Sequence, residues 1–397
     1  MIEHIRHKYS CKNCGSGVKI AAAAPRPMPK CMADPGLLSY ILISKYQYHI
    51  PLYRQSKMFS NLGVDFSRST LCDWVLGCAA IFTGLYEALQ KDVVSRSYLC
   101  TDETTVQVLK EPNKKAQSKS FMWVVMSGDK ERRGIFFKYD PTRKSKVITD
   151  ILGDYQGCLQ TDGYSGYNEV RKNNGLLDIG CWGHARRDFC DVLKLTKNKS
   201  GKSRDALHLI SKLYKIEDQA DELNLSFEDR RLLREEKARP IIEKEIVPFM
   251  VELKRKAPPK HKLGKGASYI LNNIDALKAY LSDGRIRIDN VIVENAIRPL
   301  AQGRRNWLFM NSVEGAIATA IMYSLIETCK YNDINAELYI VYLLKTLPRI
   351  PEDTDLSKLL PYNIDVSILD KVYEEAATAE AEAEDSEISE TLRQDTC

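Results

Sequence analysis

The sequence lacks any uninterrupted apolar stretch approaching the roughly 20 residues that a membrane-spanning helix requires. Its first ten residues, MIEHIRHKYS, are polar and mixed in charge, which is not the pattern of a secretory leader. Internal repeats of the kind that build solenoids are missing too. We therefore expect a cytoplasmic protein with no membrane partner.

A disulfide framework is also missing. The eleven cysteines are an odd number and are scattered, and only Cys11 and Cys14 form a compact pair. Most of the others lie in apolar runs and are expected to be small buried hydrophobic residues. With 44% hydrophobic and 28% charged residues over 397 positions, the composition predicts a soluble globular protein of about two or three structural units.

The net charge of +5 is unevenly distributed. Residues 371–397 hold nine acidic residues against Lys371 and Arg393, a net charge of −7, so residues 1–370 carry +12. This acidic, Ala/Glu/Ser-rich segment is typical of a disordered tail. The basic remainder favours a polyanionic partner such as nucleic acid, although charge alone is equally compatible with an ordinary soluble surface.

Apolar residues recur at spacings of three and four across residues 35–95, which predicts a helical region. The segment GVDFS forms a tight turn within it, and Ser67 is the expected N-cap of the following helix. Two helices around a short turn, with Arg54, Lys57 and Arg68 nearby, fit either a DNA-reading helix–turn–helix or a plain helical bundle.

The apolar pattern changes after residue 96. Strands are expected at SYLCTDETTVQVL, FMWVVMSG, RGIFFKYD, GCLQTDGYSGY and LLDIGCWGH, and helices at KSKVITDILGDY, YNEVRKNNG and ARRDFCDVLKL. The order β-β-β-α-β-α-β-α predicts an α/β fold with a ribonuclease H-like core, in which a mixed five-stranded sheet is flanked by helices. Residues 194–282 lack a strand signal and are expected to be a helical insertion.

Three acidic residues are candidates for chemistry. Asp102 lies in an apolar strand, and Asp162 lies at the end of the fourth strand. In a ribonuclease H-like sheet the first and fourth strands are adjacent, so both carboxylates should meet at one edge, where a cation such as Mg²⁺ would neutralise them. Glu294, in DNVIVENAIRPL, is the best third ligand for a two-metal site.

Each of these acids also has an ordinary structural interpretation. Glu294 precedes Arg298 by four residues, the favourable order for a surface ion pair on a helix that Asp289 or Asn290 caps. Pro299 is expected to kink or end that helix soon after the ligand.

The chain resembles the transposases of the insertion sequence 66 family, which are DDE-type enzymes. The motifs that carry the resemblance are TDETTVQVL, QTDGYSGY, GCWGHARRDF and LSDGRIRIDNVIVENAIRPLAQGRRNWLF, with a helical match upstream at SKYQYHIPLYRQSKMFSNLGVDFSRSTLCDWV. The resemblance implies a catalytic, metal-binding triad of Asp102, Asp162 and Glu294. It also implies two Mg²⁺ ions, for which Mn²⁺ can substitute.

The reaction implied is cleavage at transposon ends followed by transfer of the freed 3′-OH into target DNA. Implied partners are DNA, further copies of this chain and accessory proteins of the same element, in the bacterial cytoplasm at the nucleoid. Two alternatives stay open: an inactive DNA-binding remnant that regulates transposition, and a general ribonuclease H-like nuclease.

The sequence departs from the family pattern at two places. Val291 stands where the family has an asparagine, beside the triad helix. At the front, relatives carry a zinc-binding element built from two Cys pairs, whereas here only Cys11 and Cys14 remain, which suggests an N-terminally truncated chain. They form half of a zinc site. His4 and His7 could complete it, and the alternatives are a thiol pair or a site completed by another polypeptide.

Several basic residues are candidates for DNA contact. His184, Arg186 and Arg187 follow the fifth strand and could touch the DNA backbone, support the metal site or be structural. Arg298 lies on the Glu294 helix, and Arg304 and Arg305 are expected in a basic loop after Pro299, where they could bind phosphates. Trp307 is expected in the core.

The expected division of the chain has five parts. These are a half zinc-binding element and Ala/Pro linker (1–34), a helical region (35–95), the catalytic domain with its insertion (96–310), a C-terminal helical region (311–370) and the acidic tail (371–397).

Overall fold

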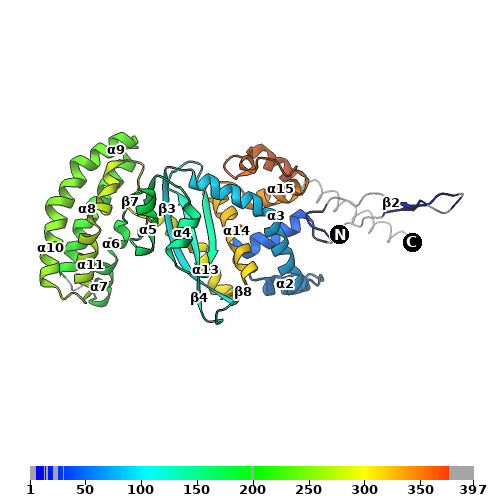
Figure 1. The fold of residues 1–397 in the computed structure, drawn as a ribbon, viewed down its shortest axis with the longest axis horizontal. Coiled ribbons are helices and arrows are strands. Elements are labelled where there is room, and N and C mark those ends of the chain that lie inside the picture. The colour runs from blue at the N-terminus through cyan, green and yellow to red at the C-terminus, as the bar shows by residue number, and fades with distance from the viewer. Residues whose placement is uncertain are drawn as a thin grey trace, which may run out of the picture.

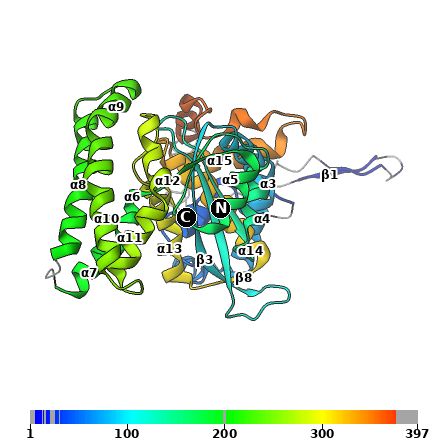
Figure 2. The same cartoon turned by 60° about the vertical axis from the view of Figure 1, so that its left-hand side comes forward.

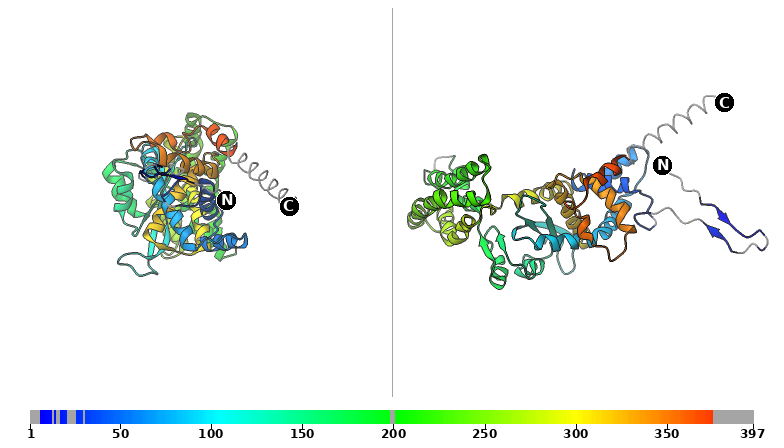
Figure 3. Two further views of the ribbon diagram at one scale, coloured as in Figure 1. Left: turned by 90° about the vertical axis from the view of Figure 1, so that its right-hand side faces the viewer. Right: turned by 90° about the horizontal axis from the view of Figure 1, so that it is seen from above.

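The computed structural model describes residues 6–12, 14, 17–20, 26–29, 31–197 and 201–374. A mixed sheet lies at the centre of an elongated molecule, with a block of insertion helices on one side and the N- and C-terminal helices on the other (Figures 1 and 3). The predicted acidic tail lies outside the described residues from position 375 onward.

The sheet has the strand order β5-β4-β3-β6-β7. Its strands are β3 (Tyr98–Lys110), β4 (Lys119–Ser127), β5 (Ile135–Asp140), β6 (Cys158–Gln160) and β7 (Leu177–Ile179). β3, β4 and β5 form an antiparallel meander, while β6 pairs in parallel with both β3 and β7. The five predicted strands are confirmed, and so is the adjacency of the first and the fourth.

The fourth and fifth strands are shorter than predicted, and β6 ends at Gln160, two residues before Asp162. LLDIGCWGH was expected to be a strand throughout, but β7 ends at Ile179 and Trp182 already begins a helix. The helices that flank the sheet are α4 (Ser145–Leu152), η1 (Ser165–Tyr167), α5 (Asn168–Asn174), α6 (Trp182–Ala185) and α7 (Arg187–Leu195).

A basic loop after Pro299 was predicted, and this prediction is wrong. Helix α13 (Val291–Trp307) continues through Pro299, so that Arg304 and Arg305 lie on its last turn. The proline deprives only the carbonyl of the exposed Asn295 of its helical partner, and water can replace that bond. The buried Leu300 and Gly303 hold the second half of the helix against its neighbours.

A sixth strand, β8 (Met310–Ser312), follows α13 and was not predicted. It pairs in parallel with the far end of β3, where Val108 is opposite Met310 and Lys110 is opposite Ser312. Three residues are too few to show an alternating pattern, so the sequence carried no signal for this strand.

The helical N-terminal region is confirmed. Its helices are α1 (Pro35–Tyr46), α2 (Leu52–Asn61) and α3 (Arg68–Val94), and the Ser67 side chain caps α3 by accepting a hydrogen bond from the Thr70 N–H (3.0 Å). α3 is long and apolar enough to cross a membrane by length and composition. However, Leu71, Phe82 and Leu89 on this helix are fully buried within the molecule, as in the core helix of a globular protein.

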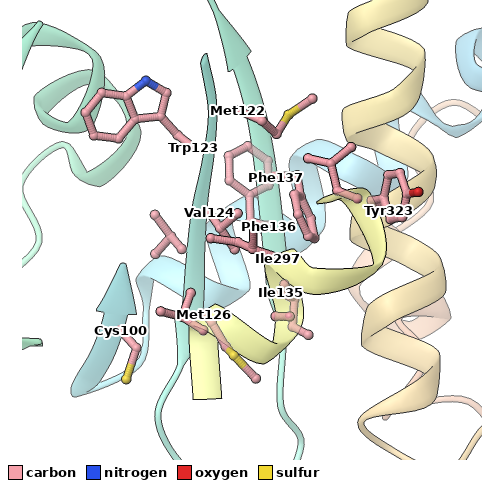
Figure 4. Close-up of a cluster of buried hydrophobic side chains, with 14 of the residues drawn as sticks. Cys100, Met122, Trp123, Val124, Met126, Ile135, Phe136, Phe137, Ile297 and Tyr323 are labelled. Carbon is pink, nitrogen blue, oxygen red and sulfur yellow. The ribbon is translucent and has the colours of Figure 1, made fainter. Parts of the chain in front are cut away.

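The core lies between the sheet and the helices α3, α13 and α14 (Figure 4). Phe137 of β5 packs against Tyr323 of α14 (5.7 Å between ring centroids), and Phe136 stacks on Tyr86 of α3 (4.6 Å). Ile297 of α13 belongs to the same buried cluster. Each such buried side chain contributes roughly 1.5–3 kcal/mol through the hydrophobic effect. The C-terminal helices are α14 (Val313–Lys330), α15 (Ala336–Thr346), η5 (Leu347–Arg349) and η6 (Leu356–Leu359).

Between β7 and α13 the chain forms a block of helices (Figure 2). Its elements are α8 (Gly201–Glu222), α9 (Phe227–Leu233), the π-helical turns η2 (Arg234–Ala238) and η3 (Ile241–Ile246), α10 (Val247–Lys256), α11 (Lys262–Asn272), α12 (Ile274–Lys278) and η4 (Ala279–Ser282). At the opposite end of the molecule, β1 (Lys8–Tyr9) and β2 (Lys19–Ile20) form a small antiparallel pair.

Candidate active site

Asp102 and Asp162 are carried by neighbouring parallel strands. Cys100 of β3 is opposite Gln160 of β6, and each aspartate follows two residues later on its own chain segment. The Asp102 carboxylate accepts a hydrogen bond from the Glu103 N–H (2.8 Å), and the Asp162 carboxylate accepts one from the Tyr164 N–H (2.8 Å). The two acids thus lie at the same edge of the sheet, as the strand order predicts.

A glycine shapes the turn that carries Asp162. Gly163 has a φ of +83°, and a β-carbon there would approach the Tyr269 hydroxyl oxygen to 3.2 Å. The same hydroxyl donates a hydrogen bond to the carbonyl oxygen of Asp162 (2.8 Å). A position with a left-handed backbone conformation and little space for a side chain favours glycine. The glycine in QTDGY therefore predicts this turn.

The electrostatic environment of Asp102 disfavours a negative charge. Burial, which has the largest effect, and the negative charges of Glu103, Asp162 and Glu294 together raise the pKa of Asp102 to about 7. Because Asp162 and Glu294 both act on Asp102, the three predicted acids share one electrostatic environment. A bound cation would reverse their mutual repulsion.

Glu294 lies in the first turn of α13, next to two residues of the CWGHARR motif. One of its carboxylate oxygens is 3.3 Å from His184 Nε2 and 3.5 Å from a terminal nitrogen of Arg187. The predicted Glu294–Arg298 ion pair does not occur in the part of the chain that the structure describes, where Arg298 is exposed.

His184 is poorly solvated. Burial and the neighbouring Arg187 charge lower the pKa of its imidazole, which therefore favours the neutral form. Its Nδ1 atom is buried and has no hydrogen-bond partner within the described residues. Of the interpretations left open for His184, contact with the acidic group of the site is the one that the geometry supports.

Asn290 attaches the helix of Glu294 to the strand of Asp102. This fully buried residue donates a hydrogen bond from Nδ2 to the carbonyl oxygen of Thr101 (3.0 Å), and its own N–H points to the Cys181 sulfur (3.2 Å). Asn290 is the N-cap residue of α13, but its side chain makes no capping hydrogen bond. The other predicted candidate, Asp289, accepts a hydrogen bond at Oδ1 from the Val291 N–H (3.2 Å). Nothing in the structure explains the valine at position 291.

The helical insertion holds the segment that leads to Glu294. The hydroxyl of Tyr214 on α8 donates to Asp289 Oδ2 (2.8 Å). Arg234, only 1% exposed, makes two hydrogen bonds to the Glu217 carboxylate (2.8 and 2.7 Å). It also donates to the carbonyl oxygens of Tyr280, Asp283 and Ile286 (2.8, 2.8 and 3.0 Å).

Sequence reasoning missed a second ion pair beside the site. Glu103 lies next to Asp102 but on the opposite face of β3, where its side chain is 1% exposed. It pairs with Arg143 and accepts a hydrogen bond from the Tyr167 hydroxyl (2.5 Å). The guanidinium of Arg143 stacks on the Tyr164 ring, 3.7 Å from its centroid. Two consecutive acids in an apolar strand were the available signal.

The remaining predicted basic residues are dispersed. Arg186 is exposed and lies over the Tyr214 ring (5.0 Å to its centroid), and Arg305 is exposed at the end of α13. Arg304 reaches Thr105 Oγ1 of β3 (3.4 Å), and burial lowers its pKa. Trp307 packs beside Tyr46 and under the Lys45 ammonium (4.6 Å), in agreement with the predicted core position.

A profile of the transposase IS66 family matches residues 30–318, and a profile of the IS66 C-terminal element matches residues 324–362. The chain belongs to the IS66 transposase family. The resemblance noted in the sequence is thereby confirmed, and membership in a transposase family implies DNA as the substrate.

Three similar proteins from Sinorhizobium fredii are named as uncharacterized proteins. Protein y4jD is 29% identical over 90% of this chain and 71% of its own length. For y4qI the identity is 30%, over 90% of this chain and 67% of the relative, and for y4hP it is 28%, over 91% and 68%. Each relative is therefore longer than the region it shares with this chain.

The donor chemistry of the site fits a hard divalent cation, because Asp102, Asp162 and Glu294 offer carboxylate oxygens. Within the described residues, however, no three His, Cys, Asp or Glu side chains converge on one point. Glu294 faces His184 and Arg187 instead. Cys11 and Cys14 are exposed between β1 and β2. Among the described residues this half zinc site has no third ligand, and His4 lies outside those residues.

Proposed function

We propose that this IS66-family protein is a DDE transposase with a ribonuclease H-like core, in which Asp102, Asp162 and Glu294 form the catalytic triad. The observation that carries the proposal is the parallel pairing of β3 with β6, together with the Asn290–Thr101 hydrogen bond. These two contacts bring the strand of Asp102, the turn of Asp162 and the first turn of α13 to one edge of the sheet.

The proposed reaction has two steps. In the first, a water oxygen bonds to phosphorus at the transposon end while the bond from phosphorus to the 3′ oxygen breaks, which leaves a 3′-OH. In the second, that 3′-OH attacks a phosphodiester of the target DNA and displaces the target's own 3′ oxygen. The three carboxylates would hold Mg²⁺ or Mn²⁺, and when bound such ions polarise the attacking oxygen and stabilise the leaving oxygen.

The residues around the triad have supporting roles in this proposal. Asn290 and Asp289 fix the start of α13, while Tyr214 and Arg234 fix the segment before it. Such supporting contacts matter because a misplacement of about 1 Å can cost roughly a hundredfold in rate. His184 and Arg187 hold the Glu294 carboxylate until DNA and cations compete for it.

A second candidate function, an inactive DNA-binding remnant, is favoured by one observation. Glu294 is engaged with His184 and Arg187, and the three acids do not converge within the described residues. A remnant would bind transposon ends but never cut them, even when the ends carry a nick. The general nuclease has no structural observation in its favour.

The experiment is a strand-transfer assay on duplex DNA that carries the ends of the element, with Mg²⁺ and with a chelator. The proposal predicts transfer products in Mg²⁺, none with the chelator and none for Asp162→Asn. Asp150→Asn, at an exposed aspartate of α4, is the matched control and should retain full activity. Full activity of Asp162→Asn would refute the triad, and binding without cleavage of pre-nicked ends would favour the remnant.

In this proposal the partners are the transposon ends and the target DNA, bound by a homo-oligomer at the nucleoid. Accessory proteins of the same element would act with it. The helix–turn–helix interpretation of α2 and α3 stays a prediction, since the exposed Arg54, Lys57 and Arg68 are compatible with both of its alternatives.

A further inference from the structure

The positive charge of this protein is concentrated at one end of the helical insertion. Residues 194–197 and 201–204, which form a first segment, and residues 254–265, which form a second, together contain ten Lys and Arg residues and no Asp or Glu. Since residues 1–370 carry a net charge of +12, the rest of that region is close to neutral. We call these two segments the basic pole.

The two segments are adjacent in space. The first comprises the end of α7 and the start of α8, and the second runs from the end of α10 to the start of α11. The ammonium of Lys262 pairs with Asp191 of α7 (2.5 Å), and the ammonium of Lys202 lies over the Phe249 ring of α10 (5.5 Å). α7 lies at one end of the helical block and α9 at the other (Figure 2). A cavity of about 290 Å³ opens between the two segments, beside Lys202, Lys256 and His261.

Helix electrostatics account for only part of this charge, namely for Lys194 in the last turn of α7 and for Lys254, Arg255 and Lys256 in the last turn of α10. Basic residues stabilise the last turn of a helix but oppose the macrodipole in the first turn, by typically 0.3–1 kcal/mol each. Lys202 and Arg204 lie in the first turn of α8, and Lys262 and Lys265 lie in the first turn of α11, where no acidic residue accompanies them. For these four first-turn residues local helix stability would favour the opposite sign, so the helices that carry them do not explain their charge.

Two helices connect the basic pole with the candidate active site. Arg187, whose side chain contacts Glu294, begins α7, and that helix ends at the basic pole. Tyr269, which donates to the Asp162 carbonyl, lies on α11 two turns from Lys262. At 1.5 Å per residue these paths measure about 10–14 Å. This length corresponds to about three or four base pairs of duplex DNA at 3.4 Å each.

We infer that the basic pole binds the phosphate backbone of duplex DNA, about three to four base pairs from the phosphodiester that is cut. Ammonium and guanidinium groups at these adjacent helix ends offer charge complementarity without base-specific contacts, so the binding is independent of sequence. The position relative to the cut bond rests on the proposed function, whereas the binding itself does not.

The test measures binding of the full chain to a 30-base-pair duplex of arbitrary sequence, in Mg²⁺-free buffer and over a series of salt concentrations. The pole variant combines Lys197→Glu, Lys260→Glu and Lys265→Glu, three exposed positions. The control variant combines Lys215→Glu, Lys237→Glu and Lys244→Glu, which are exposed elsewhere on the same helical block. Both change the net charge equally, and thermal unfolding verifies that both are folded.

The expected result is that the pole variant binds the duplex about tenfold or more weakly at 100 mM salt. The slope of log K against log salt should fall by about two to three for this variant, since three phosphate contacts are lost. The control should bind like the unchanged protein. Three results would overturn the inference: both variants bind as tightly as the unchanged protein, both lose affinity to the same extent, or the unchanged protein does not bind the duplex. This assay measures binding and involves no cleavage. Its result can therefore be interpreted even if the strand-transfer assay refutes the proposed function.

Discussion

The side-chain amide of Asn290 donates a hydrogen bond to the backbone carbonyl of Thr101, at an Nδ2–O distance of 3.0 Å. Thr101 immediately precedes Asp102, and Asn290 lies one helical turn before Glu294. The bond therefore joins two of the three proposed catalytic elements although they are almost two hundred residues apart in the sequence.

Replacing Asn290 with alanine should lower both stability and activity. The substitution leaves the buried carbonyl of Thr101 without its partner, which typically costs about 1–3 kcal/mol. Strand transfer should fall about tenfold or more at temperatures where the variant is still folded, because α13 is no longer fixed to β3. Asn295→Ala, at an exposed position of the same helix, is the control. Thermal unfolding and a strand-transfer assay measure the two effects, and equal behaviour of the two variants would contradict this role.

Removing the charge of Asp102 should stabilise the metal-free protein above neutral pH. Because the folded-state pKa of this residue is raised to about 7, the wild-type protein loses stability as the pH rises from about 4 through 7. Asp102→Asn should escape this loss and be more stable at pH 8 by roughly 1–3 kcal/mol, with no difference below pH about 4.

Denaturant unfolding at pH 4 and pH 8, in a chelator, checks this prediction. Added Mg²⁺ should reduce the difference at pH 8, since a cation that binds only the folded wild-type protein stabilises it. A variant that is less stable than the wild type at pH 8 would show that Asp102 is paired rather than repelled.

Arg234 should be the more sensitive of two neighbouring arginines. Its guanidinium is buried against Glu217 and three carbonyl oxygens, so Arg234→Met should cost about 3–5 kcal/mol. Arg231→Met, which breaks a pair with the exposed Glu228, should cost at most about 1 kcal/mol. Urea unfolding of both variants provides the comparison. Similar losses would mean that the insertion does not hold the segment before α13.

The sheet was predictable because its strands are long or flanked by clear signals. β3 and β4 have thirteen and nine residues. The sequence TDG predicts the turn at Gly163. Strand order then placed Asp102 beside Asp162, since parallel strands in this order end at one edge. The five predicted strands and this adjacency needed only local pattern and general topology rules.

The features that were missed depend on contacts between distant residues. β8 is too short to show a period, and α13 passes Pro299 because packing of Leu300 and Gly303 offsets one lost hydrogen bond. The pairing of Glu294 with His184 and Arg187, instead of Arg298, follows from where α6 and α7 lie, which no local pattern encodes. The same holds for Arg234, a charged residue that sequence alone would assign to the surface.

The most direct test of the triad is the strand-transfer rate of Glu294→Gln in Mg²⁺. If Glu294 is the third catalytic carboxylate, the rate should fall by roughly a thousandfold or more, while the thermal midpoint stays near that of the Asp150→Asn control. If Glu294 only forms a partly exposed ion pair with His184 and Arg187, its replacement should change stability by at most about 1 kcal/mol. Strand transfer within tenfold of the unchanged protein would then contradict the assignment of the triad.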